Sequence, residues 1–375
     1  MSSPSYGDGI ALARTRRIRA TPFTERVEAA GVSGWTVYNH MLLPTAFGAV
    51  VDDYRHLKTA VQVWDVACER QVEIRGRDAQ RLVQMLTPRD LRGMTAGQCF
   101  YTPMVDETGG MLNDPVTLKL SEDRYWVSIA DSDLLYWIKG LAYGFRLEVD
   151  VTEPDVSPLG VQGPLADDLM SRVFGDVVRD IRFFRFAPLK FEGRDLVVAR
   201  SGYSKQGGFE IYVEGSDLGE PLWDALFEAG KDLDVRAGCP NLIERIEGRL
   251  LSYGNDMTRA NTPHECGLEK FCNTWVAIGC VGRDALMRVE REGPVRQIRS
   301  LSVDGEAVSP CVEPWPMHVN GVPVGQLTSC TWSPDFQTNV AIGMVKMTHW
   351  DDGTELTVET PDGPRKATVK EAAFI

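Results

Sequence analysis

The sequence predicts an α+β protein with a separate, β-rich domain at its C-terminal end. Its 375 residues are 43% hydrophobic and 25% charged, which is ordinary for a globular enzyme and enough chain for two or three domains. Up to about Gly282, short antiparallel strand patterns alternate with amphipathic helical patterns, which favours α+β over a parallel sheet. Beyond Gly282 the chain is rich in Val, Ser, Gly and Pro, so we expect a small β-barrel or β-sandwich with no long helix.

In the first 149 residues, helical periodicity alternates with the period-two pattern of strands. Helices are expected over residues 21–30, 53–61, 78–86 and 132–143. Strands are expected over residues 63–74, 99–105, 111–120 and 123–129, with a glycine turn at 106–110. Pro88 lies just beyond the helix at 78–86, where a helix stop is expected.

The next hundred residues repeat this alternation of strands and helices. Strands are expected over residues 156–161, 189–191, 195–200 and 209–213. Helices are expected over residues 165–173, 220–233 and 242–251. The last of these helices carries several charged side chains and lies close to a segment with candidate functional residues.

Charge and cysteine usage exclude several classes of protein. The formal net charge is -13, with no concentrated basic stretch, so no nucleic acid partner is expected. The eight cysteines form no C-x-x-C pair and no histidine cluster accompanies them, so we expect reduced thiols and no metal site. The first twenty residues are expected to form a flexible arm without a signal peptide, and no apolar run is long enough to span a membrane. The sequence therefore predicts a cytoplasmic protein.

A glycine turn at residues 106–110 leads into a short strand that ends in Asn113 and Asp114. Successive strand residues point to opposite faces, so only one of the two side chains can reach a given site. The alternative is a hairpin turn with polar flanks and no further role.

A second glycine-bearing segment spans residues 200–212 and contains Tyr203 and Glu210. Its glycines allow a ligand to approach the backbone closely, and Tyr203 offers a stacking face. Glu210 lies among apolar strand residues, where a carboxylate needs a partner. The amino and N3–H edge of a pterin or guanine ring would supply two parallel hydrogen bonds, whereas an exposed glutamate at a strand edge is the alternative.

A third segment spans residues 245–256 and places Arg245 and Arg249 one helical turn apart. On one face of a helix, the two guanidinium groups can bind a ligand that carries carboxylates. Ordinary surface ion pairs with Asp or Glu are the alternative for both arginines.

Together these segments resemble the folate-dependent aminomethyltransferase family, which includes the T-protein of the glycine cleavage system. Five matching segments occur in family order: residues 109–114, 161–164, 200–211, 245–247 and 325–334. The resemblance implies an α+β, three-domain cloverleaf fold with antiparallel sheets, a C-terminal β-barrel domain and tetrahydrofolate in a central channel. The implied domains are residues 1–50 with 150–255 for folate binding, residues 51–149 with 256–282, and residues 283–375 for the barrel.

The resemblance also assigns folate contacts to individual residues. Glu210 matches the glutamate that holds the pterin, and Tyr203 the tyrosine that lines the folate site. Arg245 matches the helix arginine on the folate side, and Tyr101 the tyrosine before the glycine turn. Asn113 stands where the T-protein has an aspartate that assists chemistry on its aminomethyl substrate.

Longer phrases are similar to one subgroup, the tetrahydrofolate-dependent demethylases of dimethylsulfoniopropionate. These phrases include NHMLLP, LTPRDLR, LNDPV, SIADSDLL, GCPNLI and LLSYGN. A methyl sulfonium is an activated donor that needs alignment more than acid–base help, so an amide at position 113 is compatible with its chemistry. The resemblance implies an enzyme that transfers this methyl group to tetrahydrofolate, giving methylthiopropionate and 5-methyltetrahydrofolate.

In this interpretation the reacting centre is lined by Asn113 and Tyr203, and the substrate is bound by Tyr38, His40 and Tyr101. Aromatic rings around a sulfonium are worth about 0.5–2 kcal/mol per contact. Two alternatives stay open: another folate-dependent demethylase or aminomethyltransferase, and a non-catalytic folate-binding protein of the same fold. The expected partners are small molecules, with no nucleic acid or membrane, and a homodimer stays open.

Overall fold

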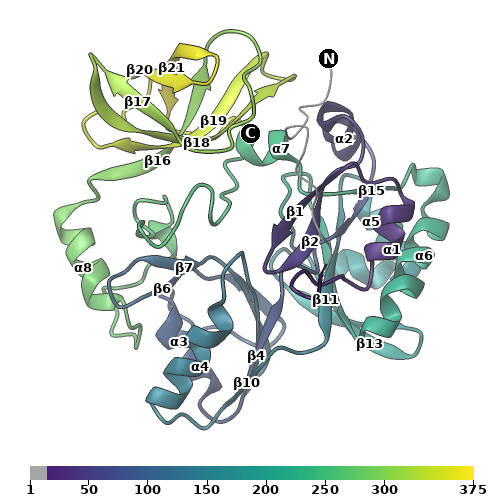
Figure 1. Cartoon of the computed structure of the whole chain (residues 1–375). Coiled ribbons are helices and arrows are strands. Elements are labelled where there is room, and N and C mark those ends of the chain that lie inside the picture. The colour runs from purple at the N-terminus through teal and green to yellow at the C-terminus, as the bar shows by residue number, and fades with distance from the viewer. Residues whose placement is uncertain (1–14) are drawn as a thin grey trace.

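The computed structural model describes residues 15–375 and shows three lobes around an irregular central segment (Figure 1). Residues 1–14, which hold most of the expected N-terminal arm, lie outside the described residues. Within the described residues, no helix is long and apolar enough to cross a membrane.

The first lobe is built on a six-stranded sheet with the order β12-β13-β14-β11-β3-β15. Its strands are β3 (Gln62–Asp65), β11 (Val156–Gln162), β12 (Phe186–Phe191), β13 (Arg194–Ala199), β14 (Gly208–Glu214) and β15 (Arg236–Gly238). Its helices are α1 (Thr24–Ala29), α2 (Val50–Leu57), α5 (Ala166–Phe174) and α6 (Gly219–Ala229). Every residue of β11 is buried, because sheet neighbours lie on both sides and a hydrophobic core packs against it.

The second lobe is built on a five-stranded sheet with the order β10-β4-β9-β8-β5. Its strands are β4 (Gln71–Arg75), β5 (Gln98–Tyr101), β8 (Val116–Ser121), β9 (Arg124–Ser128) and β10 (Asp150–Thr152). Helices α3 (Ala79–Leu86) and α4 (Leu134–Gly144) contribute to its own hydrophobic core. A short pair, β6 (Met104–Val105) and β7 (Met111–Asn113), carries the glycine turn.

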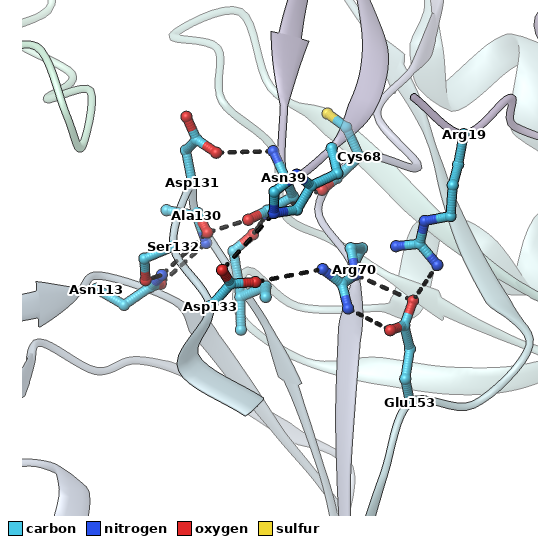
Figure 2. A network of polar contacts seen from close by, with 12 residues as sticks. Arg19, Asn39, Cys68, Arg70, Asn113, Ala130, Asp131, Ser132, Asp133 and Glu153 are labelled. Carbon is cyan, nitrogen blue, oxygen red and sulfur yellow. Dashed lines mark hydrogen bonds and ion pairs between the residues drawn. The ribbon is translucent and has the colours of Figure 1, made fainter. Parts of the chain in front are cut away.

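A hairpin from the N-terminal region reaches across to the second lobe. It consists of β1 (Gly34–Tyr38) and β2 (Met41–Ala46), with Asn39 and His40 at positive φ in its turn. The amide of Asn39 donates to the carbonyls of Cys68, Ile129 and Ala130, and its backbone N–H donates to Asp131 (Figure 2). These hydrogen bonds fix the tip of the hairpin, and therefore Tyr38, between the two lobes.

The C-terminal lobe is a closed six-stranded barrel with the order β16-β19-β18-β17-β20-β21. Its strands are β16 (Arg296–Val303), β17 (Trp315–Val319), β18 (Val322–Ser333), β19 (Thr338–Lys346), β20 (Glu355–Thr360) and β21 (Gly363–Lys370). The ten-residue α8 (Arg283–Glu292), which was not predicted from the sequence, precedes the barrel. Its only buried side chains are Ala285 and Leu286, and most of the others are charged, which weakens the apolar signal in the sequence.

Helix α7 (Leu242–Glu247) connects the first lobe to the barrel and is shorter than expected. Arg249 has a φ of 49° and lies beyond the end of the helix. The expected pairing of Arg245 and Arg249 on one helical face is therefore wrong. Four short 3-10 helices complete the chain: η1 (Asp176–Asp180), η2 (Ser216–Leu218), η3 (Lys231–Leu233) and η4 (Glu269–Phe271).

The predicted α+β class and the C-terminal barrel are confirmed. The expected domain boundaries stay a prediction. Strand β3, which falls inside the expected second domain, pairs with β11 of the six-stranded sheet. A further hydrophobic core joins Met111 of the second lobe, Ile246 of α7 and Ile342 of the barrel, so the lobes share packing at the centre.

Candidate active site

Six ionisable side chains from the first two lobes influence one another's protonation, and we call them the acidic tyrosine cluster. Its members are Tyr38, Glu69, Tyr101, Asp114, Tyr203 and Glu210. The first lobe supplies the hairpin, the 202–207 loop and β14, while the second lobe supplies the ends of β5 and β7. Because the segments come from distant parts of the sequence, the cluster exists only when both lobes are folded together.

Among residues 15–375, no cation forms an ion pair with the three carboxyl groups of the cluster. Burial raises the pKa of Asp114 to about 7. Burial, followed by repulsion from Glu210 and Asp114, raises the pKa of Glu69 well above its usual range. Burial also raises the pKa of Glu210. No ion pair in residues 15–375 involves any of the three carboxylates, so the cluster is short of positive charge.

The tyrosines of the cluster face these carboxyl groups. Burial, then repulsion from Glu69 and Asp114, raises the pKa of Tyr38. The hydroxyl of Tyr101 donates to Oδ2 of Asp114 at 2.8 Å, and burial followed by this charge raises the pKa of Tyr101. The other oxygen of Asp114, Oδ1, is buried and has no hydrogen-bond partner. A buried acceptor without a donor is uncommon in a folded protein and marks Asp114 as a candidate functional group.

Glu210 lies on the central strand β14, where its side chain is held but not saturated. Ser201 donates a short hydrogen bond to Oε2, and the Tyr212 hydroxyl donates to the same oxygen at 3.4 Å. Glu210 is only 6% exposed. In the described part of the chain no group donates to its Oε1, so this oxygen remains able to accept a hydrogen bond from a ligand.

The loop that carries Tyr203 is fixed by α7 and by glycine geometry. Oε1 of Glu244 on α7 accepts the backbone N–H of Lys205 at 2.6 Å. Gly202 has a φ of +153°, and a Cβ there would lie 2.2 Å from the side chain of Gln162. The Tyr203 hydroxyl lies 2.9 Å from the carbonyls of both Leu250 and Leu251, so it donates its proton to the backbone. Tyr203 therefore presents its ring, and not a free hydroxyl, to the cluster.

Arg245 is held by partners within the protein. It is buried, and its guanidinium donates to Asp256 and to Ser329 of β18, each at 2.7 Å. Asp256 also accepts from the Ser252 N–H and from the hydroxyls of Thr328 and Ser329. This network, which we call the Arg245–Asp256 junction, joins α7, the 250–256 segment and the barrel.

Asn113 points away from the cluster. Its amide nitrogen donates to the Ala130 carbonyl at 3.0 Å and to Ser132 Oγ at 2.8 Å, and its oxygen accepts the Ala130 N–H (Figure 2). The side chain is fully buried and ties β7 to the 130–132 loop. Because successive side chains point to opposite faces, Asp114, the second residue of the pair, is the one that points into the cluster.

His40 lies at the exposed tip of the hairpin. Its imidazole is 3.6 Å from Asp133, and 63% of its side chain is exposed. The structure thus brings together Tyr38, Tyr101, Tyr203 and Glu210, and the charge of Arg245 acts on Tyr203. It does not bring Asn113 or His40 into the same group.

Sequence reasoning did not single out Glu69 or Asp256, and it preferred Asn113 to Asp114. Strand alternation had limited the Asn113–Asp114 choice to one residue, but the sequence gives no sign of which face is inward. Glu69 follows β3 between Cys68 and Arg70, a context that is equally typical of a surface turn. Within residues 15–375, no group of three His, Cys, Asp or Glu side chains is arranged to hold a metal ion.

Comparison with known proteins places the chain in a family. Residues 23–275 match the GCVT N-terminal domain, and residues 296–375 match the glycine cleavage T-protein C-terminal barrel domain. The dimethylsulfoniopropionate demethylase DmdA of Ruegeria pomeroyi is 61% identical over 357 residues, which cover 95% of this chain and 97% of the relative.

More distant relatives have a different activity. An aminomethyltransferase of Symbiobacterium thermophilum is 29% identical, covering 88% of this chain and 91% of the relative. Among solved structures, the glycine cleavage system aminomethyltransferase T of Bartonella henselae superposes with a TM-score of 0.85 at 22% identity, covering 95% of this chain and 98% of that one. The three-lobed fold is thus the aminomethyltransferase fold, and the chain belongs to the glycine cleavage T-protein family.

Proposed function

We propose that this enzyme is a tetrahydrofolate-dependent methyltransferase that demethylates dimethylsulfoniopropionate. The high identity to a demethylase of this substrate, over nearly the full length of both chains, supports the assignment. The structural observation that carries it is a cluster of three carboxyl groups and three tyrosines for which the described residues supply no counter-cation. Such a site stabilises a bound cation, and the sulfonium group of the donor is a cation.

The donor would lie with its sulfonium among Glu69, Asp114 and the ring of Tyr38. A cation close to buried carboxylates lowers their pKa, so binding of the donor displaces protons that the free cluster retains. Aromatic faces add about 0.5–2 kcal/mol per contact for a partly desolvated cation. Tyr101, held by its bond to Asp114, would border the same space.

Tetrahydrofolate, the methyl acceptor, would be oriented by Glu210. The free Oε1 and the partly used Oε2 can accept the N3–H and the 2-amino group of the pterin as two charge-assisted hydrogen bonds. The ring of Tyr203 would line the folate. Arg245 would support the folate side through Tyr203 and the Arg245–Asp256 junction, because its guanidinium is already bonded to Asp256 and Ser329.

In the reaction, the bond between sulfur and one methyl carbon breaks as the lone pair of folate N5 forms a bond to that carbon. The bonding electrons leave with sulfur as the neutral thioether methylthiopropionate, and the N5 proton is released. Asp114, with a pKa of about 7 and a partner-free Oδ1, is the nearest group in this proposal that can accept that proton at neutral pH. The main contribution of the site is alignment of donor and acceptor.

The remaining assignments stay predictions within this proposal. Asn113 acts by fixing the backbone that presents Asp114, and His40 lies at the rim and not at the reacting centre. The domain boundaries and a cytoplasmic location are expected as stated from the sequence, and a homodimer stays open.

The test is an anaerobic assay of the purified protein with tetrahydrofolate and dimethylsulfoniopropionate. We expect methylthiopropionate and 5-methyltetrahydrofolate in equal amounts, separated by chromatography. A requirement for an aminomethylated lipoyl protein, with no turnover of the sulfonium, would instead identify an aminomethyltransferase. Folate binding without turnover of any methyl donor would indicate a binding protein of the same fold.

A further inference from the structure

Arg89 is a half-buried cation for which the described residues provide no anion. It follows α3 in the second lobe, and no ion pair in residues 15–375 includes it. Burial lowers the pKa of its guanidinium, and no carboxylate offsets that effect. The other arginine of the same loop behaves differently: Arg92 is exposed and pairs with Asp90.

Two aromatic rings and one carbonyl hold the Arg89 guanidinium in place. Its central carbon lies 4.1 Å from the ring centroid of Phe100 and 5.0 Å from that of Phe271. One nitrogen donates to the carbonyl of Tyr101 at 2.7 Å, which is the single hydrogen bond that the described residues give this side chain. A guanidinium has five N–H donors, so most of them remain available.

We call Phe100, Phe271 and the Tyr101 carbonyl around the Arg89 guanidinium the clamp. Hydrogen bonds also fix the backbone on both sides of Arg89. The Gln84 side chain donates to the Arg89 carbonyl at 2.9 Å and accepts the Leu91 N–H. Asn273, two residues after Phe271, donates its N–H to the Pro88 carbonyl and accepts the Asp90 N–H. Side chains held by packing and hydrogen bonds on both sides lose little entropy when a ligand binds.

The clamp lies next to the acidic tyrosine cluster. Tyr101 accepts from Arg89 through its carbonyl and donates to Asp114 through its hydroxyl, and its ring contacts Phe271 at a centroid distance of 5.1 Å. Within residues 15–375, a cation without an anion is therefore one tyrosine away from a carboxyl group without a cation. Both ligands of the proposed reaction carry a carboxylate in addition to the group that the cluster recognises.

We propose that Arg89, clamped between Phe100 and Phe271, binds the carboxylate of a reaction ligand. The inference rests on the proposed function for the identity of the ligands. The carboxylate belongs either to the propionate end of the sulfonium donor or to the glutamate tail of folate. A planar guanidinium stacked on aromatic faces suits two parallel hydrogen bonds to a carboxylate better than an ammonium does.

The test compares ligands with and without the carboxylate in the wild type, Arg89→Met and Arg89→Lys. Calorimetry gives affinities for tetrahydrofolate against 6-methyltetrahydropterin, and for dimethylsulfoniopropionate against trimethylsulfonium. We expect Arg89→Met to weaken one carboxylate-bearing ligand by roughly 10–100-fold and its carboxylate-free counterpart by less than about twofold. The pair that changes identifies the source of the carboxylate, and Arg89→Lys is expected to recover only part of the loss.

Arg92→Met is the matched control, because it removes an exposed charge three residues away and is expected to change none of the four affinities. Equal weakening of ligands with and without a carboxylate, or no weakening of either pair, would overturn the proposal and leave Arg89 a packing role only. If Arg89→Met does not fold, the same comparison is made with Arg89→Lys. A wild type that binds tetrahydrofolate without demethylating the sulfonium would refute the proposed function, while the folate pair would still test Arg89.

Discussion

The Arg245–Asp256 junction and the acidic tyrosine cluster both bury charge, but they do so in opposite ways. At the junction, Asp256 accepts one arginine, two hydroxyls and a backbone N–H, so each charge has its partners within the fold. In the cluster, no cation from residues 15–375 pairs with Glu69, Asp114 or Glu210, and Asp114 keeps an oxygen without a donor. The buried charges of the junction are paired with each other and connect the lobes. The buried carboxyl groups of the cluster have no paired charge and are available to a ligand.

The largest expected effect is on stability, from breaking the junction. Replacing Asp256 with Ala leaves Arg245 buried without its anion, which is expected to cost about 3–5 kcal/mol. Thermal unfolding measures this loss, and adding Arg245→Met to Asp256→Ala is expected to recover part of it. Exposed ion pairs are worth at most about 1 kcal/mol. A loss of unfolding free energy of that size in Asp256→Ala alone would therefore contradict the account.

A comparable effect on binding, with little effect on stability, is expected in the cluster. Glu210→Gln removes the charge that receives two pterin N–H groups, and tetrahydrofolate affinity should fall by on the order of 10²–10³-fold. Calorimetry measures the affinity. Glu214→Gln, at the exposed end of the same strand, is the control and should bind like the wild type. Unchanged folate affinity in Glu210→Gln would remove Glu210 from the pterin site.

A smaller effect concerns the pH dependence of stability. The folded-state pKa of Asp114 is raised from 3.8 to about 7, so the folded protein binds this proton more tightly than the unfolded chain. The stability from that proton is fully present below about pH 4 and is lost as the pH rises through 7.

Asp114→Asn removes the titration and keeps the shape of the side chain. Its unfolding temperature should therefore rise relative to the wild type between pH 5 and pH 8, by on the order of a few degrees. Asp90→Asn serves as the control, because the Arg92 side chain lowers the pKa of Asp90. The unfolding temperature of Asp90→Asn should therefore not rise relative to the wild type over this pH range. A difference between Asp114→Asn and the wild type that is constant across this pH range would show that Asp114 does not titrate there.

The sequence predicted the α+β class and the C-terminal barrel because both depend on local patterns. Helix α8 was missed, since its mostly charged surface hides the two side chains that it buries. The register of β3 with β11 joins segments almost a hundred residues apart, which periodicity alone does not report.

The site was partly predictable for a similar reason. Glu210 stands out as a carboxylate within an apolar strand, and Tyr203 as an aromatic residue in a glycine-bearing loop. The inward face of the Asn113–Asp114 pair depends on where β7 lies against the 130–132 loop. Arg245 donates a hydrogen bond to Ser329, which lies 84 residues away, so this bond could not be predicted from the sequence of its own helix.

The central claim is that the acidic tyrosine cluster selects a cationic methyl donor. Its most direct test is the affinity of the folate-bound enzyme for dimethylsulfoniopropionate relative to 4-methylpentanoate, which has carbon in place of the sulfonium sulfur and the same carboxylate. We expect the wild type to prefer the sulfonium by at least about tenfold, and Glu69→Gln to lose most of that preference. Equal affinity of the wild type for the two ligands would contradict the account.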